Sequence, residues 1–363
     1  MVIWHYGASE NANKVNGINS TIWQIAKYQA KSGNDVYLMV NTKLKSKNIE
    51  KAKEYGIHLI RIKFYKFLRN KYILPDIVHF HSVFIPHQLL YAYCFRKIKI
   101  PFIITPNGGI DPNVLKRNKI KKLIFSTIFE KMKFKNASAI VAVLPQEVEE
   151  IKHYLPKYNG RIASISNPVE SSVLKSASWE NNFQRIIITY MGRFDVLHKG
   201  IDILFEVAKK LPEFEFHLYG SRDKKTSKLF DKMLLTAGKN VFIHEPIYGV
   251  EKGKILAEST IYFQTSRWEA FGISVAEALF TGLPVFITQT MKIADLIKNN
   301  DLGVVLSGNV GEIAMKIKEE LIQRERLKNY SINASCFALK NFQPETIAIQ
   351  YIQLYKLLIN EFN

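Results

Sequence analysis

The chain has 363 residues, of which 47% are apolar and 23% are charged, a composition that excludes a disordered or fibrous protein. This length exceeds what one hydrophobic core usually fills, so two domains are expected. The two cysteines, Cys94 and Cys336, lie far apart without metal-ligand spacing around them, which argues against a disulfide framework or a zinc site. This cysteine usage fits a reducing cytoplasm.

The net charge is +19, and most of the excess lies in the first half of the chain. The basic residues cluster, mixed with aromatic and aliphatic ones, at Lys43 to Lys53, Arg61 to Lys71, Arg96 to Lys99 and Lys116 to Lys135. Such a surface favours an anionic partner such as a phospholipid headgroup, a lipid-linked phosphate or nucleic acid. A solvated basic face without a partner is the alternative.

With no secretory signal pattern and no apolar run of about 18 residues, the chain is not expected to span a membrane.

Short apolar runs alternate with amphipathic ones along the chain, the pattern of βα units with parallel strands. The first half predicts strands at Met1–Tyr6, Asp35–Val40, His58–Ile62, Ile77–His81, Phe102–Thr105, Ala139–Ala142 and Arg161–Ile165. The second half predicts strands at Ile186–Tyr190, Glu215–Tyr219, Val241–His244, Ile261–Gln264, Pro284–Ile287 and Gly303–Leu306. The expected fold is α/β, with two Rossmann-like doubly wound domains that face each other across a cleft.

The predicted domains are residues 1–168 and residues 169–344. A polar stretch from Asn167 to about Asn182 is the expected linker. The apolar and aromatic pattern from Ile349 to Ile359 predicts that residues 345–363 form a helix that returns to the first domain.

The segment 265–285 follows a predicted buried strand and enters a helix. The helix is expected to begin near Gly272 to Ser274 and to end at Gly282, with Pro284 just beyond it. The first amides of this helix, from Phe271 through Ile273, then point toward a site that favours phosphate.

Two glutamates flank this helix start. Glu277 lies about one turn into the helix and Glu269 lies on the preceding loop, so the two carboxylates can hold opposite ends of one ligand. A solvated helix face is the alternative for Glu277 alone.

The pattern Ser266-Arg-x-Glu269-x-Phe271-Gly272-x4-Glu277-Ala278-x3-Gly282-x-Pro284-Val285 resembles the signature of the family 4 retaining glycosyltransferases of the GT-B fold. The resemblance implies that Glu269 contacts the donor sugar and Glu277 the nucleotide ribose. It also implies that the backbone of Phe271, Gly272 and Ile273 holds the diphosphate. Residues 169–344 are then the nucleotide-sugar-binding domain and residues 1–168 the acceptor-side domain.

A second segment, from Ile188 to Leu204, opens the second domain and resembles the family's Gly-Arg…Lys-Gly motif. Arg193 and Lys199 follow its apolar strand. Two cations at that place can neutralise the charge that grows on a leaving diphosphate.

Three weaker segments lie in the first half. The loop around Asn16 and Gly17 follows the first strand, and it either approaches the donor closely or simply caps a helix. His79 and His81 alternate on a strand; His81, nearer its carboxyl end, is expected to reach the cleft and contact the donor sugar, while His79 packs. With no third ligand beside them, a metal site is not expected.

Asn107 occupies the histidine position of the family's Thr-Pro-His-Gly loop, which borders the reacting sugar. Because asparagine does not titrate, proton transfer at this position is in doubt.

The resemblance implies that a sugar moves from a nucleoside diphosphate to an acceptor hydroxyl with retention, and without a cofactor or a metal. By family analogy the acceptor is a saccharide or lipid-linked saccharide of a bacterial surface polysaccharide, such as capsule, O-antigen or exopolysaccharide. The location is then cytoplasmic, with peripheral contact to the anionic inner face of the membrane.

Alternatives on the same scaffold are a nucleotide-sugar epimerase and a disaccharide phosphorylase. A nucleic-acid-binding protein is a further alternative, but the sequence carries no base-stacking or groove-reading motif, so no nucleic acid is expected.

Overall fold

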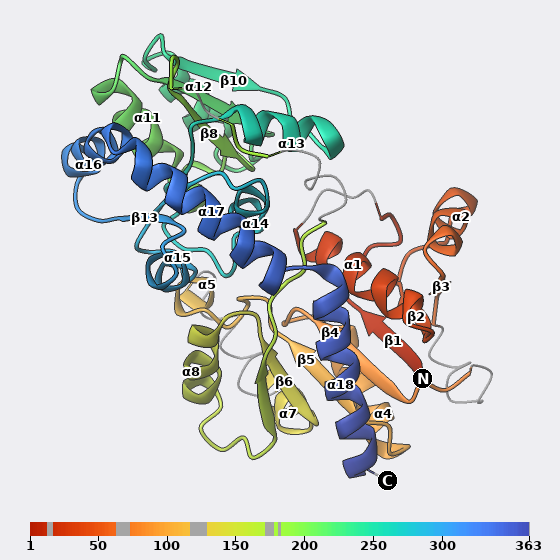
Figure 1. The fold of residues 1–363 in the computed structure, drawn as a ribbon. Coiled ribbons are helices and arrows are strands. Elements are labelled where there is room, and N and C mark those ends of the chain that lie inside the picture. Colours follow the sequence, from red (N-terminus) through yellow and green to blue (C-terminus); the bar gives the residue numbers. More distant parts are fainter. Residues whose placement is uncertain (13–16, 63–72, 117–128, 171–177, 181–182, 363) are drawn as a thin grey trace. The chain divides into compact units, whose positions relative to one another are not determined.

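A computed structural model describes residues 1–12, 17–62, 73–116, 129–170, 178–180 and 183–362. The chain forms two compact units: unit 1 comprises Met1–Pro168 and Pro344–Asn363, and unit 2 comprises Val169–Gln343. Each unit contains one parallel sheet with helices (Figure 1). Residues 171–177 and 181–182 of the expected linker lie outside the described residues.

Unit 1 has a seven-stranded parallel sheet in the order β3-β2-β1-β4-β5-β6-β7. Its strands are β1 (Val2–Tyr6), β2 (Asp35–Met39), β3 (Ile57–Ile60), β4 (Ile77–His81), β5 (Phe102–Thr105), β6 (Ala139–Ala142) and β7 (Arg161–Ser164). Its helices are α1 (Gly17–Lys31), α2 (Ser46–Glu54), α4 (Pro86–Lys97), α5 (Pro112–Lys116), α7 (Lys131–Lys135), α8 (Pro145–Tyr154) and α18 (Pro344–Phe362). The central strands β4, β5 and β6 are buried throughout, as expected for a parallel sheet covered on both faces.

The last helix, α18, belongs to unit 1 although unit 2 precedes it in the sequence. It packs along α1 over the unit 1 sheet (Figure 1). Tyr351 and Tyr355 are buried on its inner side, and the Tyr355 hydroxyl lies 2.7 Å from Nδ1 of His79 on β4. The aromatic pattern of this segment therefore reflects packing against the first domain.

Unit 2 has a six-stranded parallel sheet in the order β10-β9-β8-β11-β12-β13. Its strands are β8 (Ile187–Met191), β9 (Glu215–Tyr219), β10 (Val241–His244), β11 (Ile261–Gln264), β12 (Val285–Thr288) and β13 (Gly303–Leu306). Its helices are α10 (Val196–Lys199), α11 (Ile201–Lys210), α12 (Ser227–Leu234), α13 (Gly249–Glu258), α14 (Ile273–Phe280), α15 (Ala294–Asn299), α16 (Val310–Ile322) and α17 (Arg324–Asn341).

The strand order of each sheet reverses at one point. In unit 1, β2 and β3 lie on one side of β1, whereas β5, β6 and β7 lie on the far side of its neighbour β4. In unit 2, β9 and β10 lie on one side of β8, whereas β12 and β13 lie on the far side of its neighbour β11. Loops that leave two such strands diverge at the carboxyl edge of the sheet, and open α/β sheets bind ligands there. Each unit therefore offers one preferred place for a site.

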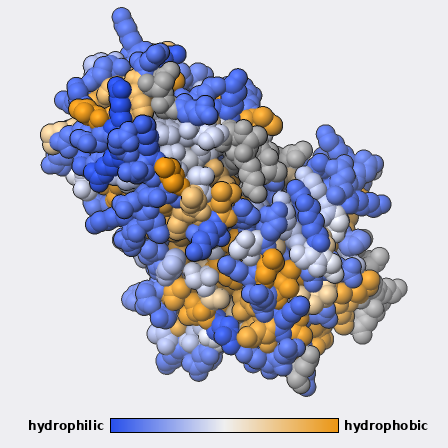
Figure 2. Space-filling model, in the orientation of Figure 1, coloured by the Kyte–Doolittle hydropathy of each residue, from blue (hydrophilic) through white to orange (hydrophobic). Residues whose placement is uncertain are grey.

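Every predicted strand is present, and the doubly wound α/β fold is confirmed. The largest shift is at β3, predicted from residue 58 to 62 and observed at Ile57–Ile60. The face drawn in Figure 2 is mainly hydrophilic, with separate apolar patches. Among the described residues, no helix combines the length and the apolar character that crossing a bilayer requires.

The core of unit 2 yields a stability prediction at Phe230 on α12, which is fully buried and stacks on Phe194 with ring centroids 4.9 Å apart. Phe230→Ala should lower the free energy of unfolding by about 3–5 kcal/mol, because it removes buried apolar surface and leaves a cavity. Leu229→Ala is the matched control, since Leu229 is 43% exposed and its truncation should cost no more than about 0.5 kcal/mol. Urea unfolding followed by tryptophan fluorescence measures both, and equal losses would contradict the packing described here.

Candidate functional site

Lys199 and Glu269 form an ion pair at the carboxyl edge of the unit 2 sheet. Lys199 ends α10, which follows β8, and Glu269 lies on the loop that follows β11. Because β8 and β11 are paired neighbours, their loops meet at the point where the strand order reverses. Both side chains are 16% exposed, so the pair is sheltered yet remains open to a ligand.

A glycine brings the two loops together. Gly200 has φ 64°, and a Cβ atom there would lie 2.0 Å from the carbonyl oxygen of Thr265. The Thr265 hydroxyl donates to the Gly200 carbonyl at 2.7 Å, which fixes the same contact. Lys199 and Glu269 can therefore meet because the residue after Lys199 has no side chain.

Buried polar groups lie beneath the ion pair. Gln264 donates from Nε2 to the Ser266 hydroxyl at 2.9 Å, and the same nitrogen lies 3.4 Å from Oε2 of Glu269. The Tyr262 hydroxyl donates to Oγ of Ser274 at 2.8 Å. Burial raises the pKa of Tyr262, so the phenol stays protonated and remains a donor. This layer ties the loop that carries Glu269 to the start of α14.

α14 begins where the sequence predicts, at Ile273, with Gly272 at φ 79° as its N-cap residue. Among the described residues, the backbone amides of 271–274 donate to no backbone carbonyl. These amides and the helix dipole make the turn a place for an anion. The Phe271 ring is buried against Phe342, with ring centroids 5.2 Å apart, so residue 271 can offer a ligand only its backbone.

Glu277 lies on α14 one turn beyond this start and forms an ion pair with Lys252 of α13. The two predicted carboxylates thus have separate lysine partners, since Glu269 pairs with Lys199. Sequence analysis did not find Lys252, because it lies on another helix, 25 residues before Glu277.

Arg193 follows β8 at the same edge, and its Nη1 lies 3.1 Å from Oδ2 of Asp223, which follows β9. Its side chain is 55% exposed, so the guanidinium remains open to a ligand. Tyr190 lies buried beneath it: burial, Tyr262 and Glu269 raise the pKa of Tyr190, and Arg193 opposes them. The Tyr190 hydroxyl donates to the Arg193 carbonyl at 2.9 Å, which fixes the turn that carries Arg193.

In unit 1, three predicted residues follow strands of the sheet at its carboxyl edge. Gly17 begins α1 and is exposed, while Asn16 lies outside the described residues. Asn107 follows β5 with φ 52°, and its Nδ2 donates to the Thr105 carbonyl at 3.2 Å. The next amide, of Gly108, donates to Glu147 at 2.9 Å. Glu147 is a buried carboxylate that fixes this turn and that sequence analysis missed.

The third predicted residue, His81, is the last residue of β4 and is 1% exposed. A third histidine, His5, also lies beside His79 and His81, although none was expected there; ligand atoms of the three rings lie within 4.8 Å of one another. The reason is strand order, because β1 pairs with β4 and places His5 opposite His79.

Comparison with known proteins assigns both halves of the chain. A family model for glycosyl transferases group 1 matches residues 174–335, and a model for glycosyltransferase family 4 matches residues 15–173. An uncharacterized 41.2 kDa protein in the cps region of Klebsiella pneumoniae is 25% identical over 315 residues, which are 83% of each chain.

Two solved structures have the same fold over nearly their whole length. Sucrose-phosphate synthase from Thermosynechococcus elongatus has a TM-score of 0.78, with 16% identity and 99% of each chain covered. The Anabaena protein HepE, in complex with UDP and glucose, has a TM-score of 0.76, with 14% identity over 98% of this chain and 99% of that one.

Two parallel-sheet α/β domains with this likeness define the GT-B fold. The two family models define the protein as a glycosyltransferase. The family 4 model matches the first half of the chain and the group 1 model matches the second half. The chain therefore belongs to glycosyltransferase family 4, with the group 1 domain as its second half. The predicted family and fold are confirmed.

The start of α14 yields a second stability prediction. Gly272→Ala should cost about 1–2 kcal/mol, because an L side chain is strained at φ 79°. Gly311→Ala is the control: Gly311 lies in the first turn of α16, where alanine should be neutral or stabilising. Thermal and urea unfolding compare the two variants, and a harmless Gly272→Ala would contradict the left-handed turn.

Proposed function

We propose that the protein transfers a sugar from a nucleoside diphosphate to an acceptor hydroxyl with retention at the anomeric carbon. The observation that carries the proposal is the Lys199–Glu269 pair beside the amino end of α14. It offers a cation, a carboxylate and helix amides at one sheet edge, which suits a ligand with both hydroxyls and phosphates. Retention is the property that the family resemblance implies.

In the proposed reaction, the bond between the anomeric carbon and the phosphate oxygen breaks. The acceptor hydroxyl oxygen forms the new bond to that carbon, and its proton passes to the leaving phosphate oxygen. The leaving diphosphate gains negative charge, which Arg193, Lys199 and the amides of 271–273 would stabilise. Since these cations belong to the chain itself, the proposal requires no divalent metal or other cofactor.

The remaining predicted residues bind and orient the donor. Glu269 and His81 would hold the sugar, and Glu277 would hold the ribose. Gly17 and Asn107 would border the donor from unit 1.

For the donor, UDP-glucose is the first compound to test, because HepE was solved in complex with UDP and glucose. For the pathway, the relative in a cps region supports a role in a bacterial surface polysaccharide, with a saccharide or lipid-linked saccharide as acceptor.

Two rival activities can be distinguished by their reactants. An epimerase would convert a nucleotide sugar without an acceptor, and a phosphorylase would need inorganic phosphate. Assays that omit the acceptor or the phosphate therefore distinguish the transferase, the epimerase and the phosphorylase.

Glu269→Ala and Arg193→Ala should each lower turnover about 10²–10³-fold while the fold is retained. Arg193 is expected to stabilise the leaving diphosphate, and Glu269 is expected to orient the donor sugar for reaction. A panel of nucleotide sugars with chelator present supplies the assay, and circular dichroism checks the fold.

Arg185→Ala is the control for the arginine. Arg185 is an exposed residue before β8, at the opposite edge of the same sheet, and it pairs with Glu215. Near-normal turnover in both site variants would refute the assignment.

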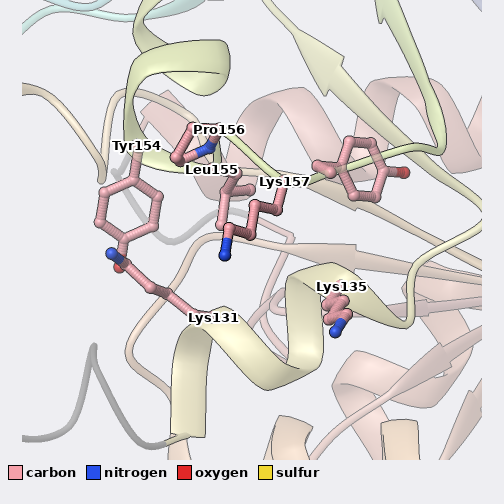
Figure 3. A pocket seen from close by; sticks show the side chains of 7 residues that line it. Lys131, Lys135, Tyr154, Leu155, Pro156 and Lys157 are labelled. Carbon is pink, nitrogen blue, oxygen red and sulfur yellow. The ribbon is translucent and has the colours of Figure 1, made fainter.

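We also propose that unit 1 contacts an anionic membrane surface on the cytoplasmic side. The supporting observation is a basic pocket on unit 1, lined by Lys131, Lys135, Tyr154, Leu155, Pro156, Lys157 and Tyr158 (Figure 3). Among the described residues, its three lysines have no carboxylate partner, and Lys131 lies over the Tyr154 ring at 5.2 Å.

The basic pocket includes segments that directly precede strands β6 and β7 of the unit 1 sheet. Lys135 ends α7 before β6, and Leu155 to Tyr158 connect α8 to β7. In a parallel sheet these segments lie at the amino edge, opposite the edge that binds the donor. Anion binding there would hold the enzyme without blocking its reaction.

The triple variant Lys131→Gln, Lys135→Gln and Lys157→Gln should bind anionic vesicles on the order of 100-fold more weakly, since each surface lysine contributes about 1 kcal/mol. The matched control neutralises three exposed lysines near α2, Lys43, Lys45 and Lys47, for the same loss of charge. Sedimentation with phosphatidylglycerol vesicles at two salt concentrations measures both. Equal losses would assign the binding to net charge, and no salt-sensitive binding at all would remove the proposal.

A further inference from the structure

Three histidine rings lie together in the interior of unit 1. His5 comes from β1, and His79 and His81 come from β4. The rings of His79 and His81 stack with centroids 3.7 Å apart, and the ring of His5 lies 5.3 Å from each of them. All three side chains are buried at the point where the strand order of the sheet reverses.

Burial keeps the three rings neutral. It lowers the pKa of His5 to about 4 and holds the pKa of both His79 and His81 well below the ordinary value. A neutral imidazole has one N–H donor and one bare nitrogen that accepts. The chemistry of each ring therefore depends on which nitrogen carries the proton, and its hydrogen-bond partners decide that.

A directed chain of hydrogen bonds runs from Gln29 on α1 to His81. Nε2 of His5 lies 2.7 Å from Oε1 of Gln29, and an amide oxygen can only accept, so Nε2 of His5 carries the proton. Nδ1 of His5 is then bare, and it lies 3.0 Å from Nε2 of His81. Nε2 of His81 must donate across this contact, which leaves Nδ1 of His81 as a bare acceptor.

His79 is linked to this chain through Tyr355, whose hydroxyl also interacts with Gln29. Its Nδ1 lies 2.7 Å from the Tyr355 hydroxyl and its Nε2 lies 2.7 Å from the Thr105 hydroxyl. Hydroxyls can donate or accept, so these contacts suit either proton position. Neither contact joins His79 to His5 or His81, so His79 does not bond the nitrogen that carries the His81 proton.

Nδ1 of His81 is the unsatisfied atom of the cluster. It is buried and has no hydrogen-bond partner among the described residues. A buried acceptor without a donor is costly, and such atoms call for an explanation. His81 is the last residue of β4, at the carboxyl edge where ligands bind in sheets of this kind.

A metal ion explains the cluster less well. Five of the six ring nitrogens are hydrogen-bonded, which leaves one lone pair where zinc needs three or four ligands. A hydroxyl group needs only one acceptor. The geometry favours a ligand that donates a single hydrogen bond.

We infer that His5 and Gln29 are positioning residues, which hold His81 in the tautomer with its proton on Nε2 so that Nδ1 accepts a hydrogen bond from a hydroxyl of the donor sugar. The inference rests on the proposed function for the identity of the ligand. The tautomer itself depends only on contacts within unit 1.

The first test is spectroscopic and needs no substrate. Nitrogen-15 histidine spectra of the full chain report which nitrogen of His81 carries the proton. We expect Nε2–H in the wild type, lost in His5→Phe, which removes the acceptor, and kept in His5→Asn, whose Oδ1 replaces Nδ1 as an acceptor. His79→Phe is the matched control, since it changes the same cluster and should leave the proton on Nε2.

The second test is kinetic. His5→Phe should lower kcat/KM for the donor about tenfold, the worth of one hydrogen bond, while His5→Asn restores most of it. If His5→Phe fails to fold, Gln29→Leu removes the other acceptor of the chain and should shift the His81 proton in the same direction.

A proton on Nδ1 of His81 in the wild type overturns the inference, because it means that Gln29 presents its amide nitrogen and every donor in the chain is reversed. An unchanged kcat/KM in a folded His5→Phe variant overturns the positioning role. If no nucleotide sugar supports turnover while the spectra show Nε2–H, the proposed function fails and the tautomer assignment stands.

Discussion

The ion pair between Lys199 and Glu269 is the interaction around which the carboxyl edge of the unit 2 sheet is organised. It joins the loops after β8 and β11, the two strands between which the order of the unit 2 sheet reverses. The approach requires Gly200, because any Cβ atom there would collide with the Thr265 carbonyl. A backbone constraint thus decides where the charges of the site lie.

The two units carry different kinds of polar groups at the carboxyl edges of their sheets. In unit 2 the polar groups are charged and partly open: Arg193 pairs with Asp223, Lys199 with Glu269 and Lys252 with Glu277. In unit 1 the three histidines are neutral and buried, and the Asn107 turn is held by the buried carboxylate of Glu147. Charged groups suit a phosphate-bearing ligand portion, and neutral hydrogen-bonding groups suit a sugar.

Helix α18, the last helix of the chain, contacts the histidine cluster of unit 1. Its Tyr355 hydroxyl contacts His79, whose other nitrogen contacts Thr105 at the end of β5. The same strands carry His81 and lead into the Asn107 turn. The returning helix therefore covers the apolar face of unit 1 and also completes the hydrogen bonds of a buried polar cluster, where an unpaired group would be costly.

The sequence by itself determined the fold and the local turns. Apolar periodicity predicts the thirteen strands named above and the return of α18, and a glycine at a left-handed position predicts the start of α14 just after Gly272. Both signals act over a few residues. Only the tertiary structure decided the partners: Lys252 for Glu277, Asp223 for Arg193, Glu147 for the Asn107 turn and His5 for His81. The reason is that strand order and helix packing bring together residues that are distant in sequence, so no local pattern records which side chains will meet.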